Sequence, residues 1–231
     1  MIFCLLQADF PIFTGHFNEL RWDEYGNFLT RRLNGLSYSD LPKKFNEIPK
    51  PLSLKYLLDS DTSKLQYKYI AYNYDTDESK ELVEDYKHYA IGLIKHKSYD
   101  LFIYSRFNDE DENFFMKSIS KAGKSVDEIA VSQMIHEEGG VGLEVVRFSL
   151  ISPDSIKVFT YEYAENPDRK ENKKTPLVTK VVIEDYAIDS LGKFNKVAID
   201  SMLLSKPMNA YLGFIHMPEG DDPVRKYWTL W

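Results

Sequence analysis

Cysteine is almost absent from this chain. The 231 residues contain only Cys4, so no disulfide can form within one chain. A lack of disulfides fits a reducing compartment, although many periplasmic proteins also lack them. We therefore expect a cytoplasmic protein, with the periplasm or the envelope as the alternative if a leader is missing from this sequence.

Long apolar runs are missing too. No stretch approaches the ~18 apolar residues of a transmembrane helix, so we expect no membrane span. Residues 1–6 are apolar but lack the basic start of a signal peptide, and the bulky Phe3 stands where a signal peptidase needs a small residue. We interpret this segment as a core strand.

Basic residues are in the minority. The chain has 29 Lys and Arg against 36 Asp and Glu, a net charge of −7. A negative surface repels phosphate backbones and anionic lipid, so we expect no nucleic-acid partner. The same surface would attract a basic protein. The alternative is that the charge only keeps the protein in solution. The oligomeric state stays open.

The residues that are abundant favour β-structure. Tyr (16) and Phe (14) are frequent, and both suit half-buried, pleated strands. Apolar and polar residues alternate with the strand period of two in many segments. The predicted strands are 66–74, 88–96, 99–107, 114–120, 126–132, 143–151, 156–163, 179–188, 194–199, 209–217 and 227–231.

Short turns connect most of these strands. Gly123 and Gly192 stand where a hairpin turn favours a positive φ, and Pro153 stands where a type I turn accepts proline. Strands that are neighbours in sequence should therefore pair antiparallel. The predicted fold class is mainly β, or β-rich α+β: an antiparallel meander of hairpins, sandwich-like or roll-like, with one or two short helices.

Two short segments favour a helix. Thr76 or Asp77 would cap a helix over 78–87, in which Leu82, Val83 and Tyr86 share one side. A second short helical turn is predicted over 52–58.

The domain organisation follows from a proline-rich connector at 40–52. We expect a single β-rich domain over 1–231. In the alternative arrangement, residues 1–50 form an N-terminal extension packed on a main sheet over 51–231.

Known catalytic and cofactor motifs are incomplete. Gly-Lys-Ser at 123–125 ends like a phosphate-binding loop, but Ser118 replaces its first glycine. His136 begins like a zinc-protease helix, but Gly140 replaces the second histidine. Val145 replaces the last glycine of a dinucleotide-binding loop, and no Gly-x-Ser-x-Gly nucleophile elbow exists. We predict no catalytic and no cofactor-binding residue. Of the two interpretations, enzyme or non-enzyme, these incomplete motifs favour the second.

Metal-ligating residues are scattered. His88 and His96 lie eight residues apart in one predicted strand, which is roughly 26 Å at the rise of a strand and too far to share an ion. With one cysteine and isolated histidines elsewhere, we predict no metal site.

Carboxylates gather in two runs, 75–85 and 109–112, and in the Gly-flanked loop 136–140. The second run lacks the spacing of an EF-hand. We take these carboxylates as candidate contacts with a basic protein partner. The alternative is a solvated acidic edge that prevents sheets from pairing. The candidate residues are Asp75, Asp77, Glu78, Glu81, Asp109, Glu110, Asp111, Glu112, Glu137 and Glu138.

One family resemblance accompanies these patterns. The segment Tyr89-Ala90-Ile91-Gly92-Leu93-Ile94, followed by 99–104 and the hairpin 121–127, resembles β-rich proteins of unknown function from Bacteroidetes. The resemblance covers residues 65–200 and implies an antiparallel architecture in a bacterial protein. It implies no functional residue.

Three functions remain open at this point. The first is a non-catalytic binding protein whose acidic loops bind a basic protein, for example an immunity protein that neutralises a toxin. The second is a cell-envelope accessory protein. The third is a hydrolase that uses two carboxylates from distant strands, which spacing in sequence does not identify.

Overall fold

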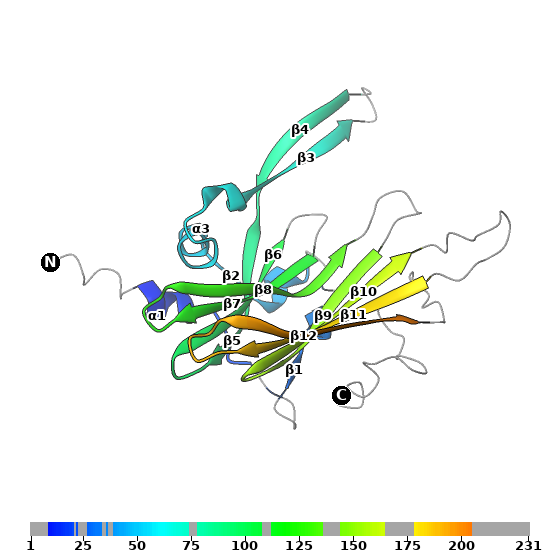
Figure 1. The fold of residues 1–231 in the computed structure, drawn as a ribbon. Helices are drawn as coiled ribbons and strands as arrows, with labels where there is room; N and C mark the ends of the chain where they lie inside the picture. Colours follow the sequence, from blue (N-terminus) through cyan, green and yellow to red (C-terminus); the bar gives the residue numbers. More distant parts are fainter. Residues whose placement is uncertain are drawn as a thin grey trace.

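The fold is seen in a computed structural model that describes residues 9–20, 22, 27–33, 36, 39–73, 78–107, 112–135, 144–164 and 178–204. Most of these residues belong to a ten-stranded sheet, and the helical segments are short (Figure 1). The predicted mainly-β fold class is confirmed.

The helical segments are α1 (Asp9–Thr14), α2 (Leu41–Lys44) and α3 (Lys50–Leu52), the 3₁₀ turns η1 (Thr30–Leu33) and η3 (Thr62–Leu65), and the π-helical turn η2 (Ser53–Leu57). The strands are β1 (Phe28–Leu29), β2 (Asn46–Glu47), β3 (Gln66–Asn73), β4 (Glu78–Asp85), β5 (Lys87–Lys95), β6 (Tyr99–Phe107), β7 (Glu112–Ser120), β8 (Ser125–Ile135), β9 (Glu144–Ser152), β10 (Ser155–Ala164), β11 (Val178–Ile188) and β12 (Phe194–Leu204).

The main sheet is a meander of hairpins. Its strand order is β12-β11-β10-β9-β8-β7-β6-β5-β2, and β1 pairs separately with β9. All these pairs are antiparallel. The turns carry the glycines that the sequence predicts: Gly123 has φ of 77° and Gly192 has φ of 90°. At Gly192 a Cβ atom would also lie 2.2 Å from Ser118 Oγ, so the turn needs glycine for space as well.

Both faces of the central strands are covered. Strands β5 and β6 are buried along almost their whole length, which is why their sequences are continuously apolar rather than alternating. Phe13 of α1 with Tyr56 and Leu57 of η2 pack on one face, and Leu33 and Leu41 pack on the other.

The sheet curls across its width. The β11–β12 turn approaches β8, where the backbone N–H of Phe194 donates to Asp127 Oδ2 at 2.9 Å. Strands β8 and β9 pair only near Gln133–Ile135, and the N-terminal segment fills the opening beyond. There Thr30 Oγ1 donates to Val131 O at 2.7 Å and accepts from Ser149 N at 2.8 Å.

The predicted helix over 78–87 is wrong. Residues 78–85 form strand β4, paired residue by residue with β3, and Leu82 and Val83 therefore point to opposite faces. The helical turn predicted over 52–58 is confirmed by α3 and η2. The segments 1–6, 209–217 and 227–231 lie outside the described residues.

Among the residues that the structure describes, no helix combines the length and the apolar character needed to cross a lipid bilayer.

Candidate binding surface

Strands β3 and β4 form a two-stranded sheet of their own, which we call the arm (66–73 and 78–85). It projects from the main sheet (Figure 1). A single residue, Tyr86, separates β4 from β5, and Tyr86 N donates to Leu65 O at 2.8 Å where the chain enters and leaves the arm. The arm is therefore a hairpin insertion, and the residues that flank it lie next to each other.

One side of the arm, which we call the isoleucine face, exposes apolar side chains. Ile70 is 74% exposed and Val83 is 49% exposed. They are diagonal neighbours in the pairing register, because Ile70 lies opposite Glu81 and Lys68 lies opposite Val83. Lys68 Nζ lies 2.7 Å from Glu81 Oε1, so an exposed ion pair lies beside the apolar pair.

The other side, the tyrosine face, carries stacked rings. The centroids of Tyr67 and Tyr69 are 5.8 Å apart, and Tyr86 continues the row 4.9 Å from Tyr67. The two hydroxyls donate to the same carboxylate, Tyr67 to Glu84 Oε2 at 3.0 Å and Tyr69 to Glu84 Oε1 at 2.8 Å. Glu84 therefore holds both rings in place on a solvent-exposed strand.

Polar contacts attach the base of the arm to the rest of the protein. Asp85 Oδ2 accepts from Lys50 Nζ at 2.6 Å, and Asp85 Oδ1 accepts from Gln66 Nε2 at 3.2 Å. These hydrogen bonds hold the pKa of Asp85 below its ordinary value. On the main sheet, the Arg106 guanidinium lies 5.3 Å from the Tyr86 ring and 4.7 Å from the Phe115 ring.

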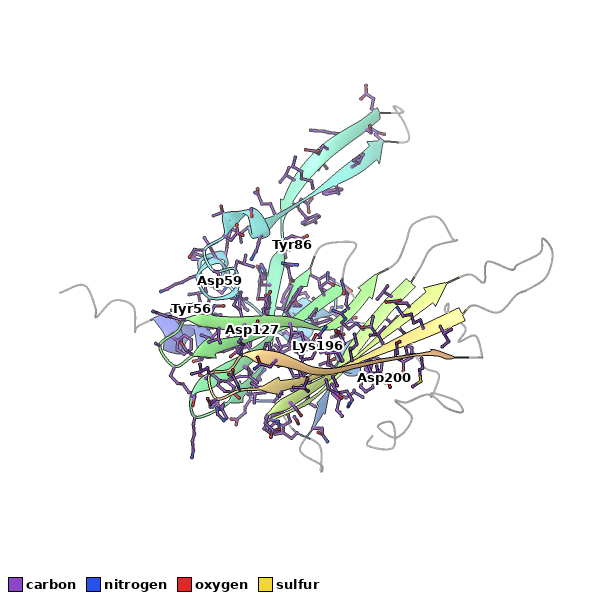
Figure 2. The ribbon with its side chains drawn as sticks, viewed as in Figure 1. Tyr56, Asp59, Tyr86, Asp127, Lys196 and Asp200 are labelled. Carbon is purple, nitrogen blue, oxygen red and sulfur yellow. The ribbon has the colours of Figure 1, made fainter. Side chains whose placement is uncertain are left out.

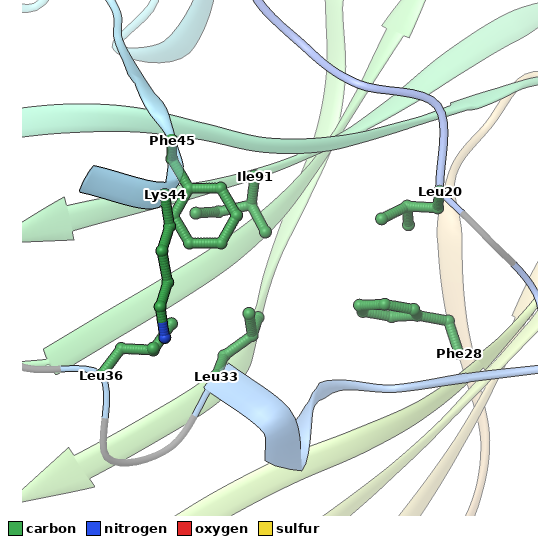
Figure 3. A pocket seen from close by; sticks show the side chains of 7 residues that line it. All are labelled: Leu20, Phe28, Leu33, Leu36, Lys44, Phe45 and Ile91. Carbon is green, nitrogen blue, oxygen red and sulfur yellow. The ribbon is translucent and has the colours of Figure 1, made fainter. Parts of the chain in front are cut away.

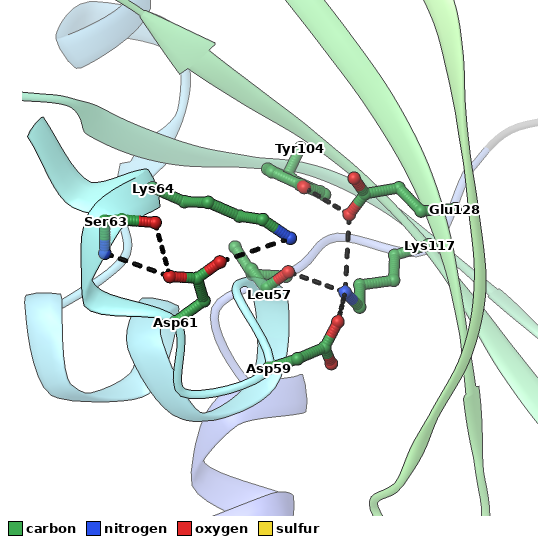
Figure 4. Close-up of polar contacts among 8 residues, drawn as sticks. All are labelled: Leu57, Asp59, Asp61, Ser63, Lys64, Tyr104, Lys117 and Glu128. Atoms are coloured by element: carbon green, nitrogen blue, oxygen red, sulfur yellow. Dashed lines mark hydrogen bonds and ion pairs between the residues drawn. The ribbon is translucent and has the colours of Figure 1, made fainter. Parts of the chain in front are cut away.

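A second polar group lies inside the protein, where η2 meets the main sheet (Figure 4). The side chain of Lys117 is only 2% exposed. Its ammonium group donates to Leu57 O at 2.6 Å, to Asp59 Oδ2 at 3.0 Å and to Glu128 Oε2 at 3.4 Å. Since an ammonium group has three donors, these acceptors use all of them.

The carboxylate of Glu128 connects Lys117 and its acceptors to Tyr104, and we call these residues together the lysine network. Tyr104 Oη donates to Glu128 Oε2 at 2.6 Å. Burial, followed by the negative charge of Glu128, raises the pKa of Tyr104 well above its ordinary value. Asp59 reaches Lys117 from a left-handed backbone conformation with φ of 53°, which is uncommon for a residue other than glycine. The arrangement fastens η2 to strands β6, β7 and β8.

His88 lies in the same region, and its Nε2 has no hydrogen-bond partner within the described structure. It is 2% exposed, and its ring lies 6.0 Å from that of Tyr104. Burial, with a smaller contribution from the charge of Arg106, lowers the pKa of His88 to about 4. The imidazole is therefore neutral at pH 7, and it adds a titratable group to the core.

An apolar cavity of about 230 Å³ lies between the N-terminal segment and the main sheet (Figure 3). Its lining residues are Leu20, Phe28, Leu33, Leu36, Lys44, Phe45 and Ile91. Ligand sites combine an apolar lining with several placed polar groups. Lys44 supplies one such group, so the cavity has room for a small apolar molecule and little with which to select one.

No three His, Cys, Asp or Glu side chains of the described segments lie where they could jointly hold a metal ion.

The predicted partner-binding residues fall in different places. Glu78 and Glu81 lie exposed on β4. Because they are three residues apart in a strand, they lie on opposite faces: Glu78 on the tyrosine face and Glu81 on the isoleucine face. Glu112 opens β7 opposite Phe107 and Met134, in the main sheet. The remaining candidates lie outside the described residues: Asp75, Asp77, Asp109, Glu110, Asp111, Glu137 and Glu138.

The sequence-based prediction omitted the tyrosines of the arm. The alternation of Tyr67 and Tyr69 was a visible signal, but their carboxylate partner Glu84 became identifiable only once the 78–85 segment was known to be a strand. The lysine network was also missed, because its members come from 57–59, 104, 117 and 128.

Comparisons with protein-family models, with curated proteins and with solved structures found no match for this chain.

Proposed function

We propose that this chain is a non-catalytic binding protein that docks a basic protein through its arm. A toxin-neutralising immunity protein is the form of this function that we propose. The observation that carries the proposal is the exposure of Ile70 and Val83 on a hairpin that no other described strand pairs with.

An isolated two-stranded hairpin is marginally stable in water. Protein interfaces typically combine an apolar centre with a polar rim, and they are enriched in tyrosine. The arm offers both, because Ile70 and Val83 lie beside the Lys68–Glu81 ion pair, and Tyr67 and Tyr69 occupy the opposite face. A partner that covers the arm would remove apolar surface from water and support the hairpin.

The charge of the arm favours a basic partner. Residues 66–85, which are the arm and the four residues that connect its strands, carry six carboxylates against two lysines. Their net charge of −4 is more than half of the chain's −7. Complementary charge accelerates association and makes it sensitive to salt. The complex should therefore weaken as the salt concentration rises.

The test is affinity capture from native cells with matched charge variants as bait. The arm variant carries Glu78→Lys and Glu81→Lys, and the control carries Glu19→Lys and Glu47→Lys, all at exposed positions. The two are matched, because Glu81 and Glu19 each have an exposed lysine partner, Lys68 and Lys95 respectively.

We expect a protein with a high isoelectric point to be captured by the unchanged chain and by the control, and to be lost from the arm variant and in high salt. A partner that binds the arm variant as well as the control, or that has an acidic surface, would contradict the proposal.

A further inference from the structure

The two edges of the main sheet differ. One edge ends in β2, a strand of two residues that lies within the proline-rich connector 40–52. Very short strands and prolines are ways in which proteins protect a sheet edge from pairing with another chain. The opposite edge is β12, which runs for eleven residues, Phe194–Leu204.

Within the described residues, the β12 edge has weaker protection: a bulge opposite Asp185 and Tyr186, and Asp200, whose Oδ1 accepts from the backbone N–H of Ser201 at 2.8 Å. From Ala198 to Leu203 the strand carries a single charge, Asp200. Ile199 is 65% exposed and Leu203 is 69% exposed, and they lie on one face because they pair with Glu184 and Lys180 of β11. Figure 2 shows Asp200 on this outer strand.

We propose that β12 is a self-association surface, at which a second copy of this chain pairs antiparallel with β12 and extends the sheet through the dimer. The pairing is centred on Ser201, so that Ser201 faces its own copy and its N–H exchanges Asp200 Oδ1 for an acceptor on that copy. Ile199 of each copy then lies opposite Leu203 of the other, on the same face of the joined sheet.

A second copy fits this edge because the charges agree with the register. Around Ser201, Asp200 lies opposite Met202 of the other copy rather than opposite the second Asp200. Each chain carries a net charge of −7, so two copies repel at most places on their surfaces. The charge-poor segment Ala198–Leu203 is where two copies can approach with little repulsion.

Cysteine cross-linking tests the register. In a Cys4→Ser background, Ser201→Cys places two thiols opposite each other, within the Cα separation of 4.4–6.8 Å that a disulfide requires. Ser79→Cys, at an exposed position on the arm, is the matched control. On mild oxidation we expect a disulfide-linked dimer from Ser201→Cys and a monomer from Ser79→Cys. Equal cross-linking of the two variants would overturn the register.

Analytical ultracentrifugation tests the association itself. The unchanged chain should sediment as a dimer, and the double variant Ile199→Lys/Leu203→Lys should raise the dimer dissociation constant by about a hundredfold or more, because four apolar partners are lost and lysines face each other. A circular dichroism spectrum unchanged from that of the parent would show that the variant is folded. A monomeric parent chain, or a double variant that stays dimeric, would overturn the proposal.

Discussion

The main sheet and the arm use the same side chains in different surroundings. In the main sheet, Tyr104 donates to Glu128 beside the buried Lys117. In the arm, Tyr67 and Tyr69 donate to Glu84 on a strand that is exposed almost throughout. Burial makes the first arrangement part of the stability of the fold. Exposure leaves the second available to a partner, so identical chemistry has different consequences in the two regions.

The largest expected difference concerns the lysines. Lys117→Met removes a buried ammonium group and leaves Asp59, Glu128 and Leu57 O without it, so we expect a loss of about 3 kcal/mol in the free energy of unfolding. Lys68→Met removes an exposed ion pair in the arm and should cost less than about 0.5 kcal/mol. Urea denaturation of the two variants measures the difference.

Equal losses for the two lysine variants would break the comparison. A small loss for Lys117→Met would mean that the lysine network adds little to the attachment of η2. Tryptic digestion provides an independent control, since a weakened attachment should speed cleavage at Lys55.

The next prediction concerns acid. Because the pKa of His88 is about 4 in the folded state and 6.5 ordinarily, the unfolded state binds the proton first as the pH falls. The stability contributed by the neutral imidazole is therefore complete above pH ~6.5 and is lost progressively towards pH ~4. Between pH 7 and pH 5 we expect the free energy of unfolding to fall by about 2 kcal/mol for this reason.

His88→Leu should remove this part of the pH dependence. His96→Gln changes an exposed ring that stacks on Tyr99, and it should leave the pH dependence intact. Thermal unfolding across this pH range compares the three proteins. If His96→Gln flattened the profile and His88→Leu did not, the assignment to the buried histidine would be wrong.

The smallest expected difference concerns the tyrosine hydroxyls. Tyr104→Phe removes a buried hydrogen bond to Glu128 and should cost about 1 kcal/mol. Tyr69→Phe removes the corresponding bond to Glu84, where water can replace it, and should cost about 0.3 kcal/mol. Chemical denaturation at pH 7 measures both. A larger cost in the arm than in the main sheet would reverse the comparison.

Much of the main sheet could be predicted because its signals are local. Alternation and turn residues such as Gly123 and Gly192 lie within a few positions of the strands that they connect. The 78–85 segment gave a false helical signal, because Leu82, Val83 and Tyr86 match a helical spacing. Its pairing with β3 decides the conformation, and pairing is not encoded in the segment itself.

The candidate surface could be predicted only in part. The acidity of 75–85 is a property of the sequence, and it is the reason that Glu78 and Glu81 are candidates. Their contact with a partner stays a prediction. The division of the arm into two faces requires the register, which places Ile70 with Val83 and Tyr67 with Glu84. The lysine network depends on Asp59, which is 58 positions from Lys117, and no local pattern relates the two.

Removal of the arm tests the central claim most directly. The arm's ends meet at the hydrogen bond from Tyr86 N to Leu65 O, so residues 66–85 can be replaced by a two-residue Asn-Gly turn. Capture from native cells is then compared for the complete and the shortened chain. We predict that the shortened chain stays folded and captures no basic partner. A folded, shortened chain that still captures the same partner would contradict the assignment of binding to the arm.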